Sequence, residues 1–158
     1  MKKIAFLLLI VLGGLLSVRA ELKPGANAPD FELKGVDGEM VSLNDYKGSE
    51  GVILIFTCNP CPFAKAYEQR IIKLHHKYAS EGYPVLAVNP NDVDISPDDT
   101  MEKMLERAQE KEYPFAYLKD ESQSVYKSYG ATRTPHIYLL QRKGDKFKVA
   151  YVGAIDDN

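Results

Sequence analysis

The two cysteines of the chain stand close together, in Cys58-Asn59-Pro60-Cys61. Cysteines with two residues between them can open and close one small disulfide, so the chemistry they offer is thiol–disulfide exchange. The pair follows the apolar run 51–56, which predicts a buried strand leading into a helix start. A helix N-terminus stabilises anions, so we expect Cys58 to have a pKa below the ~8.5 of a free thiol. We expect Cys61, one turn inside the helix, to be more buried and protonated.

Three neighbours, Thr57, Asn59 and Pro60, complete this helix start. Pro60 suits a first turn, where its missing N–H leaves no hydrogen bond unmade. A structural disulfide, half of a zinc site and two reduced core cysteines are the alternatives. A four-cysteine zinc site needs a second pair, which the chain lacks. A disulfide that closes so short a loop stabilises little, so the redox interpretation is favoured.

A second candidate lies far along the chain, where Thr134-Pro135 precedes the apolar segment 136–140. Proline is tolerated at the first residue of a strand. A cis bond here would let Thr134 present its backbone to a substrate beside the cysteines, and we expect this bond to face Cys58. An ordinary trans proline that marks a strand start is the alternative. His136 comes next, and with both cysteines it would form a Cu(I) site; an ordinary strand position is favoured.

The elements that must hold these residues follow from the apolar pattern. We expect strands at 28–33, 40–43, 51–56, 83–88, 115–118, 136–140 and 147–152, and helices at 63–78, from 96, and from 120 to Gly130. In Ser96-Pro97-Asp98-Asp99 the serine is expected as the N-cap and the acids in the first turn. Alternating strands and helices imply a largely parallel sheet between two helical layers, with an antiparallel edge at the end. The predicted class is α/β.

Residues 1–20 have the pattern of a signal peptide. Lys2 and Lys3 precede the apolar run 4–16, and small or modest side chains follow up to Ala20. The run is shorter than the ~20 residues of a membrane-spanning helix, although an uncleaved anchor is the alternative. We expect cleavage near Ala20 and a periplasmic or secreted protein. A net charge of −2 provides no basic surplus for binding nucleic acid.

Ala28-Pro29-Asp30-Phe31, the strand running into Cys58-Asn59-Pro60-Cys61-Pro62-Phe63, and Thr134-Pro135 together resemble the thioredoxin-fold redoxins. These include the alkyl hydroperoxide reductase/thiol-specific antioxidant relatives and exported thioredoxin-like thiol reductases. The resemblance covers about residues 24–153. It implies a thioredoxin-like three-layer sandwich with a mixed central sheet and an N-terminal β-hairpin. It also implies that Cys58 is the exposed nucleophile, Cys61 the resolving thiol and Pro135 the cis-proline of the substrate groove.

The sequence also departs from the family pattern. The chain has no Trp, and the segment 52–56 lacks the buried acid of thioredoxins. The proton relay for Cys61 is therefore unassigned, with Glu68 and Lys65 as weak candidates. The Pro-x-x-x-Thr-x-x-Cys motif of peroxiredoxins is absent. The family fold usually ends in a helix after the last strand; we expect the domain at 21–158 to lack it and to expose that strand's apolar face, or the chain to be a fragment of a longer product.

The resemblance implies an exported thiol–disulfide oxidoreductase that reduces protein disulfides. It would need no cofactor beyond the redox-active Cys58–Cys61 disulfide. Its partners would be exported protein or cytochrome-type disulfide substrates and an upstream thiol electron donor, such as a membrane protein. The alternatives are a thiol peroxidase and a non-enzymatic Cu(I) chaperone that uses Cys58, Cys61 and His136.

Overall fold

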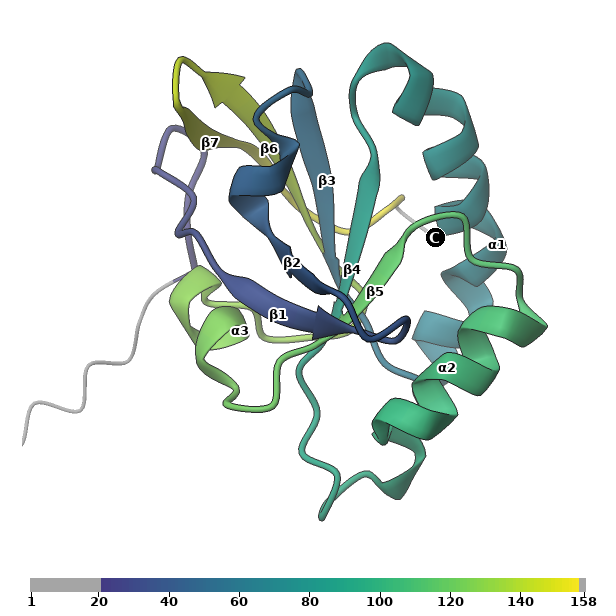
Figure 1. Ribbon diagram of the computed structural model, residues 1–158. Coiled ribbons are helices and arrows are strands. Elements are labelled where there is room, and N and C mark those ends of the chain that lie inside the picture. The colour runs from purple at the N-terminus through teal and green to yellow at the C-terminus, as the bar shows by residue number, and fades with distance from the viewer. Residues whose placement is uncertain (1–20, 157–158) are drawn as a thin grey trace, which may run out of the picture.

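A mixed sheet of 7 strands in the order β2-β1-β5-β4-β3-β6-β7 forms the middle layer of the protein (Figure 1). The computed structural model describes residues 21–156, so the expected signal peptide at 1–20 lies outside the described residues. The strands are β1 (Glu32–Gly35), β2 (Met40–Ser42), β3 (Gly51–Phe56), β4 (Val85–Asn89), β5 (Ala116–Lys119), β6 (His136–Lys143) and β7 (Lys146–Gly153). The helices are α1 (Pro62–Tyr78), α2 (Met101–Glu110) and α3 (Ser124–Tyr129), with short 3₁₀ turns η1 (Leu43–Tyr46), η2 (Ala79–Glu81) and η3 (Pro97–Asp99).

Helices α1 and α2 cover one face of the sheet and α3 covers the other (Figure 1). Strand β3 lies in the middle, parallel to β4 and antiparallel to β6, and all of its residues are buried. Its alternate side chains point to opposite faces: Leu54 and Phe56 pack toward α3, and Ile53 and Ile55 toward α1. The expected α/β three-layer sandwich, with a mixed sheet and an N-terminal hairpin of β1 and β2, is confirmed.

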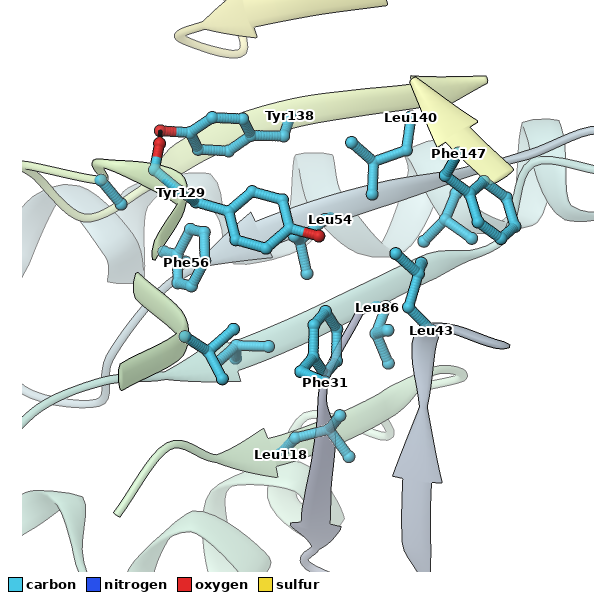
Figure 2. Close-up of a cluster of buried hydrophobic side chains, with 14 of the residues drawn as sticks. Phe31, Leu43, Leu54, Phe56, Leu86, Leu118, Tyr129, Tyr138, Leu140 and Phe147 are labelled. Carbon is cyan, nitrogen blue, oxygen red and sulfur yellow. Dashed lines mark hydrogen bonds between the residues drawn. The ribbon is translucent and has the colours of Figure 1, made fainter. Parts of the chain in front are cut away.

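The core on the α3 side is rich in aromatic rings, as Figure 2 shows. Phe56, Tyr129 and Tyr138, the aromatic cluster, are each 0% exposed. Their ring centroids lie 5.4 to 5.7 Å apart, the spacing of favourable edge-on contacts. The hydroxyl of Tyr138 donates to the backbone oxygen of Tyr129 at 3.0 Å, so its polar end is satisfied inside the core.

Three expectations about the helices are wrong. Helix α3 begins at Ser124, with Gln123 as its N-cap, rather than at residue 120. The second helix begins at Met101 rather than at residue 97, and its N-cap is Thr100, whose hydroxyl accepts from the Lys103 amide at 3.3 Å. Ser96 caps only η3. Asp99 is therefore not a solvated first-turn acid; its side chain turns inward and is 0% exposed. Phe63, expected on the buried stripe of α1, lies in the first turn of that helix and is 70% exposed.

An apolar groove of about 610 Å³ lies between the C-terminal half of α1 and strands β6 and β7. Its walls include Leu74, Tyr78, Ile137, Leu139 and Tyr151. Tyr151, on β7, is 46% exposed. The absence of the family's last helix stays a prediction. Within residues 21–156, no helix is long and apolar enough to cross a membrane.

Candidate active site

Both cysteines lie in the connection between β3 and α1. Thr57 extends the sheet by one more hydrogen bond, from its N–H to the Val88 oxygen at 2.9 Å. Cys61 is the N-cap of α1, with extended backbone angles of φ −61° and ψ 122°. The expectation that Cys61 lies one turn inside the helix is therefore wrong. Pro62 explains the difference, because proline at the first helical position disfavours helical angles in the residue before it.

The two thiols differ in exposure, in the opposite sense to the expectation. Both are free, but Cys58 is 5% exposed, whereas Cys61 is partly exposed. Burial raises the pKa of the Cys58 thiol against the opposing hydrogen bond from Thr134. Burial also acts on Cys61, but hydrogen bonds from the amides of Ala64 and Phe63 and from Thr134 outweigh it and lower the Cys61 pKa. Cys61 rather than Cys58 thus occupies the anion-stabilising position at the helix N-terminus.

The second predicted segment lies against both cysteines. The Thr134–Pro135 bond is cis, as expected. The Thr134 hydroxyl lies 3.2 Å from the Cys58 sulfur, and the Thr134 carbonyl accepts from the Cys61 thiol at 3.4 Å. Thr134 and Pro135 are themselves partly exposed. Segments more than seventy residues apart in sequence therefore meet at one small, accessible site.

His136 does not join this site. In β6 it pairs with Phe56 and contacts Tyr138, on the α3 side of the sheet. Its Nδ1 accepts from the Thr132 amide at 3.3 Å, and its Nε2 lies 2.9 Å from Glu21 Oε1. Within residues 21–156, no three His, Cys, Asp or Glu side chains gather to hold a metal ion. The alternative of a Cu(I) site at Cys58, Cys61 and His136 is therefore not supported by their positions.

A buried polar network borders the cysteine connection on the side of β4. Its centre is the Asp99 carboxylate, 0% exposed. Oδ1 accepts from the Asn59 backbone amide at 2.8 Å and from Asn89 Nδ2 at 2.7 Å. Oδ2 accepts from Asn91 Nδ2 at 2.8 Å and from the Ser96 hydroxyl at 2.6 Å. These five residues, with Tyr117, are called the Asp99 cluster below.

The same network holds the side chain of Asn59, the residue directly after Cys58. Its Nδ2 donates to the Asp98 carbonyl at 2.8 Å, and its Oδ1 accepts from the Tyr117 hydroxyl at 3.0 Å. Sequence reasoning assigned Asn59 only to the helix start and did not identify Asp99 as part of the site. A usable signal exists: Asn59 and Asn89 each stand where a buried strand ends, at the edge where parallel strands place their carboxyl ends together.

The two weak candidates for a proton relay are occupied or exposed. Glu68 receives two hydrogen bonds from Arg107, at 2.5 and 2.7 Å, and one from the Tyr113 hydroxyl at 2.7 Å. This arrangement ties α1 to α2. Lys65 is exposed on α1. Neither side chain hydrogen-bonds to a cysteine, so the relay stays unassigned.

Comparison with known proteins identifies the family. The sequence profile of the AhpC/TSA family matches residues 24–150. The chain belongs to the AhpC/TSA family. Among its relatives, the thiol-disulfide oxidoreductase ResA of Geobacillus thermodenitrificans is 30% identical over 128 residues, which is 79% of this chain and 67% of that protein. ResA of Bacillus cereus is 27% identical over 134 residues, or 83% of this chain and 71% of the relative.

Solved structures agree with this assignment. An uncharacterized conserved protein from Geobacillus kaustophilus is 38% identical with a TM-score of 0.81, over 87% of this chain and 71% of that one. The exposed lipoprotein thioredoxin Etrx1 of Streptococcus pneumoniae is 26% identical with a TM-score of 0.64, over 81% and 92%. The expected thioredoxin fold and the expected enzyme class, a thiol–disulfide oxidoreductase, are confirmed.

Proposed function

We propose that this enzyme reduces disulfides of exported proteins through Cys58 and Cys61. The observation that carries the proposal is the shared contact of both free thiols with Thr134, beside the cis bond to Pro135. A dithiol next to a partly exposed backbone segment can receive an extended client and exchange a disulfide with it. A depression of about 300 Å³, lined in part by Gln123, Tyr126, Arg133 and Thr134, adjoins this segment and can take a client side chain.

The proposed reaction has two exchanges. One thiolate of the pair attacks a client sulfur; a mixed disulfide forms, the client S–S bond breaks, and the departing client sulfur takes a proton. The second cysteine then loses its proton and attacks the mixed disulfide. The Cys58–Cys61 disulfide forms, and the client leaves as a dithiol with two more electrons. An upstream dithiol donor must then return two electrons to the enzyme.

Export is the part of the proposal that rests on residues 1–20. Their basic start and apolar run have the signal-peptide pattern. We expect mass spectrometry of the protein from the periplasm or medium to find Glu21 at the N-terminus. A full-length chain retained in the membrane fraction would contradict export, and clients and donor would then have to be sought elsewhere. Oxidised cytochrome-type proteins are the client class to test first, with exported disulfide proteins as the second.

Single-cysteine variants test the exchange itself. Cys58→Ser and Cys61→Ser should each abolish disulfide reduction, and one of them should accumulate a mixed disulfide with a client, because attack occurs and resolution cannot. That variant names the attacking cysteine. If both variants keep the activity of the unaltered protein, the proposal is wrong. Rapid consumption of hydrogen peroxide without client reduction would instead favour the peroxidase alternative.

Alkylation of the reduced protein tests the order of reactivity. Cys61 is the more exposed thiol and the one with a lowered pKa. It should therefore react before Cys58 with a small alkylating agent near neutral pH. The reduction potential of the pair gives the direction of electron flow: a value near about −270 mV marks a reductant and one near about −120 mV an oxidant. We expect the reducing end of this range.

A further inference from the structure

The buried carboxylate of Asp99 accepts two hydrogen bonds at each of its oxygens, about the full capacity of an ionised carboxylate. Four donors converge on its two oxygens, and all four come from residues outside α2. One of the four is the backbone amide of Asn59, which lies between the two cysteines. We propose that Asp99 is the positioning residue of the cysteine pair: its buried carboxylate clamps the backbone between Cys58 and Cys61 and sets the two thiols apart in reactivity.

Two sets of hydrogen bonds hold Asn59 in the connection between β3 and α1, one at its backbone amide and one at its side chain. The Asn59 amide is held by the Asp99 carboxylate, and the Asn59 side chain is held by the Asp98 carbonyl and the Tyr117 hydroxyl. Asn59 is 6% exposed, so water does not replace these partners readily. Because Cys58 directly precedes Asn59, fixing this peptide also fixes the Cys58 sulfur against Thr134.

The donors around Asp99 indicate that it carries a negative charge. An ionised carboxylate only accepts hydrogen bonds, which is the pattern seen at both oxygens. A buried cation lies nearby: Lys119 is 4% exposed, and its Nζ donates to the backbone oxygen of Asn91. Asp99 is therefore a buried negative charge that is compensated by four hydrogen bonds and a nearby buried cation.

This charge acts on the two cysteines unequally. Burial is the main cause of the raised pKa of Cys58, and the negative charges of Asp99 and Cys61 add to it. Asp99 is not among the main causes that act on Cys61, whose pKa is lowered by amides of α1 and by Thr134. The titratable groups that face Cys58 are Cys61, Asp99 and Tyr117. Asp99 thus favours the protonated form of Cys58, whereas the amides of α1 and Thr134 lower the pKa of Cys61.

The test measures the alkylation rate of each cysteine against pH, with the two sites separated by mass spectrometry, in the full reduced protein. Asp99→Asn removes the charge but keeps an oxygen for the Asn59 amide. A fall of one unit in the pKa of Cys58 raises its thiolate fraction at pH 7 about tenfold and lowers the nucleophilicity of that thiolate about threefold, so alkylation speeds up about threefold. We expect the pKa of Cys58 to fall and its alkylation to speed up severalfold in Asp99→Asn, with no change at Cys61. The control is Asp98→Asn, an exposed neighbour that contacts Asn59 only through its backbone.

A second variant separates charge from damage to the loop. Ser96→Ala removes one donor and leaves the Asp99 charge less compensated, so the pKa of Cys58 should stay or rise. A lowered pKa of Cys58 in Asp99→Asn, together with an unchanged or raised one in Ser96→Ala, would support the proposal. A lowered Cys58 pKa in both variants, or an unchanged Cys58 in a folded Asp99→Asn protein, would overturn it.

The proposal rests on the proposed function only in taking Cys58 and Cys61 as the reactive site. Its readout is the titration of each thiol and not turnover, so it stands or falls separately from client reduction. If Asp99→Asn does not fold, Ser96→Ala decides by itself: a lowered pKa of Cys58 would count against the proposal, and an unchanged or raised one in its favour.

Discussion

The carboxyl end of β3 separates two buried regions of opposite character. On the α3 side lies the aromatic cluster of Phe56, Tyr129 and Tyr138, held by contact area between rings. On the side of β4 and α2 lies the Asp99 cluster, held by directed hydrogen bonds to one carboxylate. The cysteine connection begins where these regions meet. One strand thus borders both the aromatic cluster, which stabilises the fold, and the Asp99 cluster, which we propose adjusts the reactivity of the cysteines.

The two regions should respond differently to substitution. Apolar packing is roughly proportional to buried area and degrades by steps as atoms are removed. A buried polar network is less tolerant, because each donor left without its acceptor carries a desolvation cost. The aromatic cluster should therefore control stability with little effect on thiol chemistry, and the Asp99 cluster should control both.

The largest expected effect on stability is in the aromatic cluster. Phe56→Ala removes a fully buried ring that contacts both tyrosines. We expect the free energy of unfolding to fall by about 3–5 kcal/mol, from lost transfer energy and the cavity left behind. Urea denaturation at constant m-value measures it. A loss below about 1 kcal/mol would show that the surrounding side chains fill the cavity. The aromatic cluster would then not control stability as we expect.

A smaller effect is expected where α1 meets α2. Arg107→Met leaves Glu68, whose side chain is 10% exposed, with one donor, the Tyr113 hydroxyl, in place of three hydrogen bonds. We expect a loss of about 2 kcal/mol, below the ~3–5 of a fully buried pair because both side chains keep some contact with water. The double variant Glu68→Leu with Arg107→Met should recover most of this loss, since no charge is then left unpaired. A double variant less stable than the single one would contradict this.

The apolar half of this comparison was predictable from the sequence, and so was the location of the cysteine site. The strand at 51–56 has the unbroken apolar run of a doubly covered strand, and it is buried throughout. Cys58, Cys61, Thr134 and Pro135 were chosen from the sequence, and the structure brings all four together. The strand was predictable from its local apolar pattern, and the site from the combination of the cysteine pair with the later Thr-Pro.

The polar half was not predictable in the same way. Ser96 and Asp99 have the composition of a helix start, and only the fold shows that Asp99 turns inward to meet Asn59. The order of exposure of the two cysteines was missed because Pro62 moves the first helical residue past Cys61. In both cases the sequence correctly indicated a helix start, but the helix begins a few residues later than expected. These residues lie in connections, where no apolar periodicity fixes the position of the helix start.

Two buried tyrosines provide a matched test of the comparison. Tyr117 donates to Asn59 at 3.0 Å and accepts from Asn89 at 3.1 Å, whereas Tyr138 makes one hydrogen bond, to a backbone oxygen. Each Tyr→Phe change removes only a hydroxyl. We expect about 1–2 kcal/mol for Tyr117→Phe, with two partners left unsatisfied, and about 1 kcal/mol or less for Tyr138→Phe. Equal losses in thermal or urea unfolding would mean that the Asp99 cluster is no less tolerant than the core.

The smallest expected effect is a pH dependence from His136, which lies beside the aromatic cluster. Burial lowers the pKa of His136 below its usual 6.5, with the charge of Arg133 acting in the same direction and Glu21 opposing it. The folded protein therefore resists a proton that the unfolded chain accepts. Stability from this residue is complete above about pH 6.5, the unfolded pKa, and is lost as the pH falls toward the lower folded value.

Replacing His136 should remove this part of the acid sensitivity. In His136→Gln the fall in the free energy of unfolding between pH 7.5 and pH 5.5 should be smaller than in the unaltered protein. His75, whose pKa burial also lowers, is present in both proteins, so its contribution cancels in the comparison. Arg133→Ala should act in the same direction more weakly, because it removes one cause of the lowered His136 pKa and leaves burial in place. A steeper acid loss in His136→Gln would mean that the native state holds this histidine protonated, paired with Glu21, and the assignment of a neutral ring beside the aromatic cluster would be wrong.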